Sequence, residues 1–362
     1  MHVVLHTICP SHGSLNAPPS RNAIDRDDPR WADGRFPKND GSPGCTEDFA
    51  WDNYCGCWGS NGTEAYAPGQ ACLWFNQGCT IGCDACDPKA RSPWDRDICG
   101  SGMQPRVCNP DHRTLNRFAR CGSKEDWTRF NPWRAPGNAP VYDACGKAGG
   151  QDAFEPRHGA AYYIATAHAR VGDLGSRVLP RSPSGVDWAA GSTVRTAWTL
   201  HANHGGGYQF RLCSIGEELT EACFQKRPLP FAGRQQLQFK GNATAFDIVP
   251  TYVSEGTSPP GSTWARNPIP IDPTNFEPPC ADPVPDPYFP NPVPFNSKID
   301  ATPKRCWGNF PPHVQIIDWL RVPADTPPGE YVLGWRWDGE QSAQIWQGCS
   351  DITITRPAIV EV

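Results

Sequence analysis

The stretch STVRTAWTLHANHGGGYQFRLC, residues 192–213, decides the expected fold. From Val194 to Leu200 every second residue is β-branched or large and apolar, which is the two-residue period of a strand with one buried face. Three glycines follow His204, and a second alternation begins at Tyr208. The stretch therefore predicts two strands on either side of a glycine-rich turn.

Other segments with the same strand-like pattern lie in the second half of the chain. They are QLQFKGNATAFDIVP (236–250), HVQIIDWLRVP (313–323), GEYVLGWRWD (329–338) and SDITITRPAIVEV (350–362). Helical periodicity is weak throughout. Strands spread over both ends of a chain favour two antiparallel sheets that share one core. We expect an all-β fold, an antiparallel immunoglobulin- or fibronectin-like β-sandwich with long disulfide-rich loops.

Length and composition favour one elaborated domain over residues 12–362. The chain has 362 residues, 38% of them hydrophobic, with 15 Trp and 15 Phe, so a large core can form. The 40 Pro and 35 Gly predict many turns. Prolines crowd residues 259–312, where PPCADPVPDPYFPNPVPF predicts a surface loop. We find no internal repeat.

Charge excludes some classes of partner. The formal net charge is −5 and the pI about 6.0, and no run of Lys or Arg would follow a phosphate backbone, so we expect no nucleic-acid partner. The longest mostly apolar segment begins near Ala160 and has about half of the roughly 20 residues that a membrane helix needs. We expect no membrane association, and a monomer.

The 17 cysteines can be interpreted in two ways. Close pairs such as Cys55/Cys57, Cys79/Cys83 and Cys83/Cys86 resemble zinc spacing, but no matched partner set follows them. Eleven cysteines fall in residues 45–145, which have turn-rich sequence. We favour disulfides over zinc, and interpret this region as a cysteine-rich loop insertion.

Disulfides imply an oxidising compartment, and two glycosylation sequons, at Asn61 and Asn242, fit a secreted glycoprotein. The first 11 residues lack the basic start and apolar length of a complete signal peptide. Removing them also removes Cys9 and leaves 16 cysteines, an even number. We expect an extracellular protein whose leader, residues 1–11, is removed so that the mature chain starts at His12.

Three stretches concentrate unusual chemistry. They are SHGSLNAPPSR (11–21), the HANHGGGYQFRLC part of the opening stretch (201–213), and GEQSAQIWQGC (339–349) within the last strands. Their order resembles the copper-dependent lytic polysaccharide monooxygenases, most closely the group with chitin-binding type-4 domains. The resemblance extends from residue 12 to about residue 354 and is weak through the cysteine-rich insertion.

The resemblance implies one copper ion held in a histidine brace. His12 would bind copper through its α-amino and imidazole nitrogens, and His204 would add a third nitrogen. Three neutral nitrogens suit copper and leave positions open for oxygen or peroxide. A terminal amine, with a pKa of about 7.7 to 8.0, loses its proton onto a metal readily. The resemblance also implies that Gln344 hydrogen-bonds the oxygen species, while Trp346 stands where the family has Tyr or Phe.

Several other residues have a functional and a structural interpretation. Glu340 could place peroxide or pass protons, or form an ion pair with Arg336. His201 is a competing ligand, but strand alternation should turn it away from His204. Arg21 is expected to form a structural salt bridge. The aromatic residues proposed either for polysaccharide binding or for the core are Trp74, Trp133 and Tyr142.

The leading functional hypothesis is a secreted copper-dependent monooxygenase that cleaves a polysaccharide oxidatively, with an external electron donor. Two alternatives stay open: a polysaccharide-binding module without catalysis, and a copper-binding protein without turnover. A two-carboxylate glycosidase is disfavoured, because no acid pair stands out at strand ends.

Overall fold

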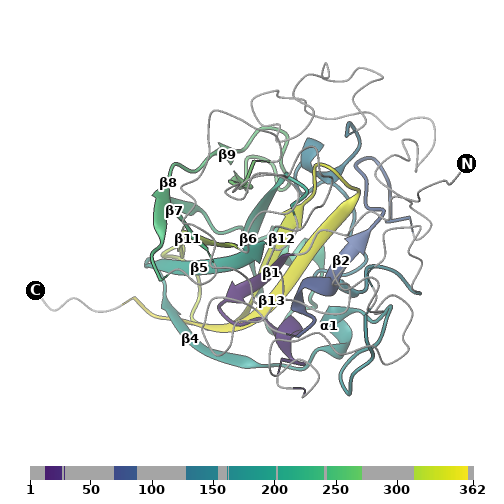
Figure 1. Ribbon diagram of the computed structural model, residues 1–362. Helices are drawn as coiled ribbons and strands as arrows, with labels where there is room; N and C mark the ends of the chain where they lie inside the picture. The colour runs from purple at the N-terminus through teal and green to yellow at the C-terminus, as the bar shows by residue number, and fades with distance from the viewer. Residues whose placement is uncertain are drawn as a thin grey trace, which may run out of the picture.

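The structure is a computed structural model, and it describes residues 13–26, 28, 69–87, 128–153, 161, 163–200, 203–239, 243–270 and 314–357. Within these ranges the chain forms two β-sheets and two short α-helices, α1 (Gly175–Val178) and α2 (Glu221–Gln225) (Figure 1). The expected all-β sandwich is confirmed. Among the described residues, no helix is long and apolar enough to cross a membrane.

The smaller sheet has five strands and is antiparallel throughout. Its order is β1 (Gly13–Ala17), β5 (Thr193–Leu200), β11 (Val314–Arg321), β7 (Phe231–Phe239) and β8 (Phe246–Ile248). The N-terminal strand β1 is therefore an edge strand whose first residue, Gly13, pairs with Leu200 at the end of β5.

The larger sheet has eight strands. Its order is β3 (Lys147–Ala148), β2 (Trp74–Gln77), β13 (Gln344–Thr355), β12 (Gly329–Asp338), β6 (Gly207–Ser214), β10 (Trp264–Arg266) and β9 (Tyr252–Val253), and β4 (Pro183–Ala189) pairs with β13 in parallel. The long strands β12 and β13, at the C-terminal end of the colour scale, lie side by side through the middle of Figure 1.

The opening stretch, residues 192–213, forms both predicted strands, but they do not form a hairpin. β5 belongs to the smaller sheet and β6 to the larger one. The glycine-rich turn is thus a crossover between sheets at one end of the sandwich. Gly206 has φ +78° there, and a Cβ at this position would lie 2.0 Å from the backbone oxygen of Asp338. Only glycine fits this approach.

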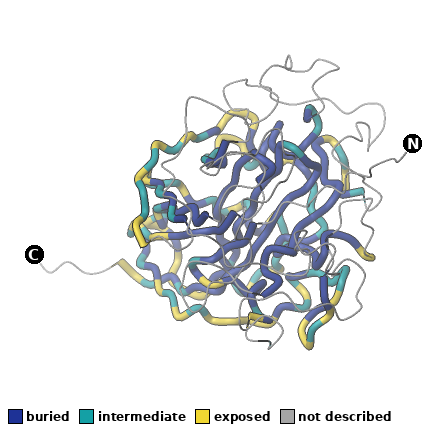
Figure 2. The backbone as a smooth tube through the Cα atoms, viewed as in Figure 1, coloured by how far each residue is buried: buried dark blue, intermediate teal, exposed yellow. Residues whose placement is uncertain are grey.

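The core lies between the sheets and contains side chains from both. Trp198 of β5 contacts Trp335 and Trp337 of β12, with ring centroids 5.1 and 5.3 Å apart. Both ends of the chain contribute, since a Cβ on Gly348 of β13 would lie 2.9 Å from the Cβ of Leu15 of β1. Figure 2 shows the central strands buried and the exposed residues at the periphery.

A buried ion pair joins the segment after β1 to β13. Arg21 Nε donates to Asp351 Oδ2 at 2.8 Å, and both side chains are almost fully buried. Asp351 also accepts from the backbone N–H of Ser182. The prediction of a structural salt bridge for Arg21 is confirmed.

Disulfides, not zinc sites, account for the described cysteines. The bonds are Cys79–Cys86, Cys145–Cys349 and Cys213–Cys223. Cys72 and Cys83 are also disulfide-bonded. The zinc interpretation of the Cys79/Cys83 and Cys83/Cys86 spacings is thus wrong, and the pair Cys55/Cys57 lies outside the described residues.

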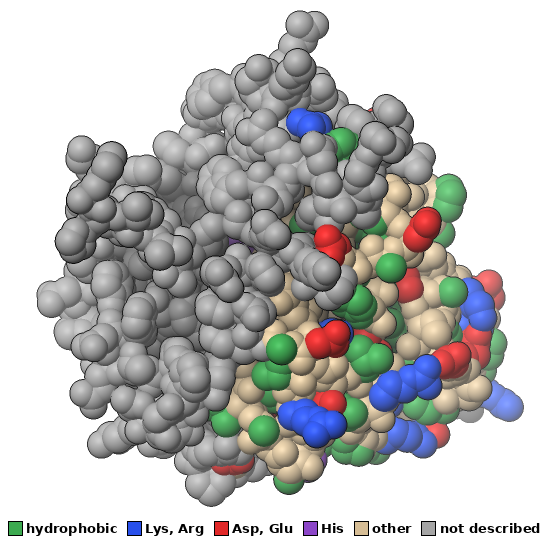
Figure 3. All heavy atoms as spheres, turned by 90° about the vertical axis from the view of Figure 1, so that its right-hand side faces the viewer, with side chains coloured by type: hydrophobic (Ala, Val, Ile, Leu, Met, Phe, Trp, Pro, Cys, Tyr) green, Lys and Arg blue, Asp and Glu red, His purple; other side chains and the backbone are tan. Residues whose placement is uncertain are grey.

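On the described part of the face in Figure 3, acidic and basic side chains lie interspersed rather than in blocks of one sign. Exposed ion pairs of the structure include Arg177–Glu218 and Arg181–Glu330. Pairs of this kind contribute little stability each, about 0 to 1 kcal/mol. The sandwich therefore owes its stability to its core and its disulfides.

Asp318 of β11 gives the core a testable pH dependence. Its carboxyl group is fully buried, accepts from Tyr208 Oη at 2.7 Å and from Gln235 Nε2 at 3.0 Å, and burial raises its pKa from 3.8 to about 7. Between these values the folded state holds a proton that the unfolded state has lost. Stability should therefore fall as pH rises, by about 1 kcal/mol per pH unit.

We expect Asp318→Asn to abolish this slope. Between pH 5 and pH 8, urea unfolding should show the free energy of unfolding of the wild type falling by roughly 3 kcal/mol more than that of the variant. Asp247→Asn on β8, where the carboxylate is exposed, is the control and should keep the wild-type slope. Equal slopes in the wild type and Asp318→Asn would show that Asp318 does not titrate as a buried acid.

Candidate metal and catalytic site

The crossover between β5 and β6 holds His204 against the turn that joins β12 to β13. The backbone oxygen of His204 accepts from the N–H groups of Glu340, at 3.2 Å, and Gln341, at 3.0 Å. His204 is 3% exposed. Residues 339–343 thus form one wall of the site, and β13 begins directly after them.

The imidazole of His204 is neutral at neutral pH. Its Nδ1 faces Gln341 Oε1 at 3.0 Å, and Gln344 also hydrogen-bonds the ring. Burial outweighs these contacts and lowers its pKa to about 4. A neutral imidazole is the form that binds metals, and a hydrogen bond to one ring nitrogen sets which nitrogen is left for the metal.

Two asparagines hold the crossover in place. Asn203 Oδ1 accepts from Gly205 N at 2.8 Å and from Asn267 Nδ2 at 2.9 Å, while Asn203 Nδ2 donates to Ile269 O at 2.9 Å. Asn267 N donates to the backbone oxygen of Gly206 at 2.8 Å. The segment after β10 thus fixes the backbone on both sides of His204.

Trp346, on β13, lies beside His204 and is fully buried, with its ring centroid 5.8 Å from the imidazole. It stacks on Phe75 of β2 at 5.3 Å and contacts Trp337 of β12 at 4.9 Å. Trp346 is therefore both a core residue and a neighbour of His204. Gln344 is buried on the same strand.

Glu340 lies in the wall of the site, but it is not the partner of Arg336. Arg336 pairs with Asp338, Nε to Oδ1 at 2.6 Å, and with Glu221 at 2.8 Å, so the alternative of an Arg336–Glu340 ion pair is wrong. Burial lowers the pKa of the Arg266 guanidinium on β10. The carboxylate of Glu340 partly offsets this lowering, because its negative charge favours the charged guanidinium. Glu340 is fully buried.

The structure does not support an aromatic platform formed by the predicted residues. Trp74 is 0% exposed and packs against Tyr163, and Trp133 is 5% exposed and packs with Trp264. Of the two interpretations of these residues, the structural one fits Trp74 and Trp133, because both rings are buried.

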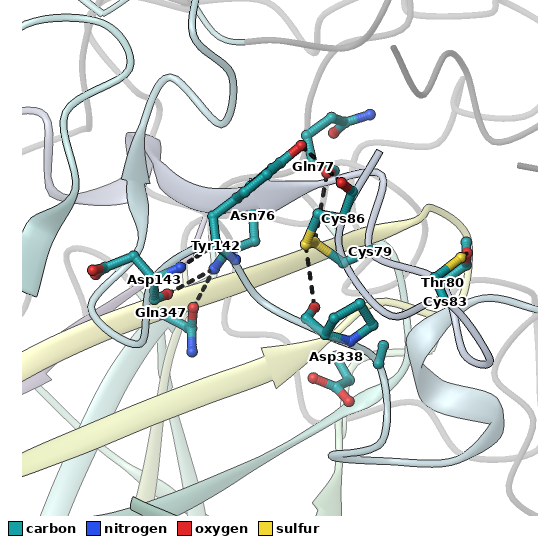
Figure 4. The surroundings of a disulfide bond; sticks show 12 residues. Asn76, Gln77, Cys79, Thr80, Cys83, Cys86, Tyr142, Asp143, Asp338 and Gln347 are labelled. Carbon is teal, nitrogen blue, oxygen red and sulfur yellow. Dashed lines mark hydrogen bonds between the residues drawn. A yellow bond between two sulfur atoms is a disulfide. The ribbon is translucent and has the colours of Figure 1, made fainter. Parts of the chain in front are cut away.

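Tyr142 is half-buried, and its interactions join the cysteine-rich insertion to the sheet. Its Oη donates to Cys86 O at 3.0 Å (Figure 4). Lys147 Nζ lies 4.3 Å from the ring centroid. Asn76 of β2 accepts from the backbone N–H of Tyr142 at 2.8 Å and bonds Gln347 of β13. The phenol is thus structurally engaged, and the part of the insertion around it packs on the strand that carries Trp346.

His12 and His201 lie outside the described residues. Gly13, the neighbour of His12, is described, and a Cβ on it would lie 3.0 Å from Trp337 Cζ3. Trp337 Nε1 donates to the backbone oxygen of Gly205 at 2.8 Å. One indole therefore contacts the residue that follows His12 and the residue that follows His204.

The described side chains fit a copper site only in part. Among them, no group of three His, Cys, Asp or Glu gathers that could hold a metal ion. His204 is a suitable nitrogen ligand, since it is neutral and its ring is held by an amide oxygen. The remaining donors would have to come from outside the described residues, where both His12 and His201 lie.

Sequence reasoning selected His204, Gln344, Trp346 and Glu340, and the structure brings these four together. It missed the residues that hold them: Gln341, Asn203 and Asn267. The position of Gln341, directly after Glu340 in the same turn, is a signal that could have pointed to it.

Comparisons with known proteins give weak structural matches. No protein-family model and no curated protein matches the sequence. A lytic polysaccharide monooxygenase AA15 from Thermobia domestica in the Cu(I) state is 16% identical, with a TM-score of 0.23 over 47% of this chain and 62% of that one.

Two further solved structures match over nearly the whole chain. A chitin-binding domain from Burkholderia pseudomallei is 12% identical, with a TM-score of 0.29 over 96% of this chain and 100% of that one. The cellulose-active monooxygenase CelS2 in complex with copper is 12% identical, with a TM-score of 0.29 over 95% of this chain and 100% of that one. Scores of this size do not assign the chain to a family.

Proposed function

We propose that the chain is a secreted, monomeric, copper-dependent monooxygenase that cleaves a polysaccharide oxidatively. The observation that carries the proposal is the convergence of His204, Gln344, Trp346 and Glu340 at the end of the sandwich where β1 begins. These residues come from two distant segments of the sequence, and His12 directly precedes β1. The polysaccharide and an external electron donor are the proposed partners.

His12 and His204 would hold the copper ion, provided that residues 1–11 are removed. The α-amine of His12 is a ligand only when no residue precedes it. Copper held there would supply the redox chemistry that turns peroxide or oxygen into an oxidant able to take a hydrogen atom next to a glycosidic bond.

The chain's own residues prepare this site. Gln341 accepts from Nδ1 of His204, which leaves Nε2 as the nitrogen with a lone pair for a ligand bond. Gln344 presents a second amide to the same ring and can hydrogen-bond a small oxygen species. The buried ring of Trp346 excludes water from one side of the imidazole.

Glu340 is the ionisable residue of the turn formed by residues 339–343. Its backbone N–H is bonded to His204, so its carboxylate is tied to the site. The guanidinium of Arg266 lies within electrostatic range of this carboxylate. We propose that Glu340 holds or accepts a proton beside His204.

The test is product analysis. Protein that starts at His12, loaded with copper and supplied with a reductant and peroxide, should release oxidised oligosaccharides from one of chitin, cellulose, xylan or pectin, as detected by mass spectrometry. The same protein treated with a chelator should release none. Polysaccharide pull-down without oxidised products, and without copper binding, would instead identify a binding module. Tight copper binding without turnover would identify a copper carrier.

Gln341→Leu should weaken copper binding by about 10- to 100-fold, because it removes the partner that fixes the tautomer and orientation of His204. Gln236→Leu is the matched control, since Gln236 lies on β7 and bonds Asp247 away from the site. Calorimetric titration with copper measures both variants. An unchanged affinity in Gln341→Leu would mean that Gln341 does not position the ligand.

A further inference from the structure

The smaller sheet faces the core with one side only, and its outer face carries a partly exposed indole. On β11, Ile316 and Leu320 belong to the core, so the two-residue period of the strand places Trp319 and Arg321 on the opposite face. Trp319 is half-buried, and Arg321 is exposed. This part of the outer face is therefore open to solvent, and the indole contributes to a surface rather than to the core.

Three arginines share this face with Trp319. Arg195 of β5 lies opposite Trp319 in the register of the sheet, and Arg234 of β7 lies over the indole, with its Cζ 4.2 Å from the ring centroid. Arg195, Arg234 and Arg321 are all exposed. Among the described strands of this sheet, Asp247 of β8 is the acidic residue that faces the same side. The face thus carries a surplus of positive charge on a chain whose formal net charge is −5.

Arg234 is positioned to bind an anion from solvent. The indole attracts its guanidinium by a cation–π contact, and Nε donates to Asp247 Oδ1 at 3.3 Å, so two contacts hold the group in place. Among the described residues, neither Nη group of Arg234 has a hydrogen-bond partner, and the side chain is 54% exposed. N–H groups in this planar arrangement form the fork that binds both oxygens of a carboxylate.

Amide side chains continue the surface beside the arginines. Gln236 and Gln238 alternate with the core residues Leu237 and Phe239 on β7, so they lie on the outer face, where both are half-buried. Gln236 Nε2 donates to Asp247 Oδ1 at 2.8 Å. A primary amide both donates and accepts hydrogen bonds, as a sugar hydroxyl does. The surface therefore combines groups that bind carboxylates, hydroxyls and apolar C–H groups.

This combination fits the chemistry of an acidic sugar polymer. A uronic acid presents an apolar C–H face, hydroxyl groups and a carboxylate on one ring, and aromatic rings bind apolar surface while arginines bind carboxylates. An acidic peptide offers the carboxylates without the flat C–H face. We propose that the outer face around Trp319, with Arg195, Arg234, Arg321 and Gln236, is a second polysaccharide-binding surface whose ligand is a polyuronate.

The proposed surface lies away from the site around His204. Arg195 and Leu200 stand near opposite ends of β5, about 17 Å apart by the rise of an extended strand, and Leu200 pairs with Gly13 at the end where the metal site is proposed. Binding at this surface needs no copper and uses no residue of that site. The surface goes beyond the proposed function, because it holds a polymer to the protein whether or not the protein cleaves it.

The experiment is affinity electrophoresis of the copper-free protein in gels that contain polygalacturonate or alginate. Fully methyl-esterified galacturonan, which has no carboxylate, is the neutral comparison. The affinity of the wild type for at least one of the two polyuronates should exceed that for the methyl ester by about tenfold or more, and it should fall as salt is added, because exposed charge pairs are screened. Polyglutamate, which offers charge without sugar, should bind more weakly than the polyuronate.

The arginines are tested by a double variant. Arg234→Gln combined with Arg321→Gln should weaken polyuronate binding about tenfold, roughly threefold for each exposed ion pair. Arg170→Gln combined with Arg177→Gln is the matched control, because it makes the same change in net charge at side chains that are 81% and 64% exposed and lie outside the smaller sheet. The control should bind as the wild type does.

The indole is tested by two variants of Trp319. Trp319→Ala should weaken polyuronate binding, because it removes both the ring that contacts the sugar and the support of Arg234. Trp319→Phe keeps an aromatic ring and should restore part of the binding. Circular dichroism shows whether these variants fold, and the arginine variants test the surface without changing the half-buried ring.

No binding to either polyuronate, equal binding to the methyl ester or to polyglutamate, or unchanged binding in the Arg234 and Arg321 double variant would overturn the inference. Polyuronate binding by this face in a protein that binds no copper would uphold the inference while the proposed function fails. Oxidised oligosaccharides released by a copper-loaded protein that binds neither polyuronate would give the reverse.

Discussion

His204→Ala is expected to reduce copper affinity by more than about 100-fold. Loss of a residue that only supports a metal ligand costs up to roughly 100-fold in affinity. The substitution removes a nitrogen ligand itself and leaves Gln341 facing an empty space. The imidazole is neutral above about pH 4, so the wild type should bind copper across the neutral range. Calorimetric titration at pH 6 to 7 measures the difference.

His168→Ala is the matched control for this experiment. His168 is exposed on a turn, and its backbone N–H bonds Thr166, so its loss should leave copper affinity unchanged. Circular dichroism and thermal unfolding show whether His204→Ala keeps the fold. A folded His204→Ala protein that binds copper as tightly as the wild type would remove His204 from the site.

Gly206→Ala is expected to have the largest effect on stability, about 3 kcal/mol or more. The added methyl group would meet the backbone oxygen of Asp338 at 2.0 Å, and the residue would have to hold φ at +78°. Neither strain can be relieved by turning a flexible side chain. Because Gly206 follows the His204–Gly205 pair, displacement of the crossover should also lower copper affinity.

Gly216→Ala is the control, because nothing lies within 4 Å of the Cβ position there and its φ is not in the left-handed region. In urea unfolding, the free energy of unfolding of Gly216→Ala should be close to that of the wild type, and that of Gly206→Ala should be far lower. Equal stabilities of the two variants would mean that the crossover is not constrained as described.

The strands were predictable because each carries its own alternation. Val194 and Trp198 point into the core, as the two-residue period requires, and the same logic located β12 and β13. Which sheet each strand joins was not predictable from local pattern. The glycine-rich turn between β5 and β6 is also compatible with a hairpin. Only the long-range pairing of β5 with β11 and of β6 with β12 places the two strands in different sheets.

The candidate site was predictable where it rested on a motif, as for His204 and Gln344. It was not predictable where it rested on contacts between distant segments. Asn203 meets Asn267, 64 residues away, and nothing in either local sequence indicates the other. The choice between surface and core for Trp74 and Trp133 stayed open for the same reason, since a loop sequence does not reveal what packs over its rings.

One measurement tests the central claim most directly, because His12 can donate its α-amine only at the start of the chain. Copper titration should compare protein that starts at His12 with protein that keeps Ser11 in front of it. We predict one tightly bound copper ion in the first protein and a loss of more than about 100-fold in affinity in the second, where the amine has become an amide. Equal affinities, or no copper bound by either protein, would contradict the account.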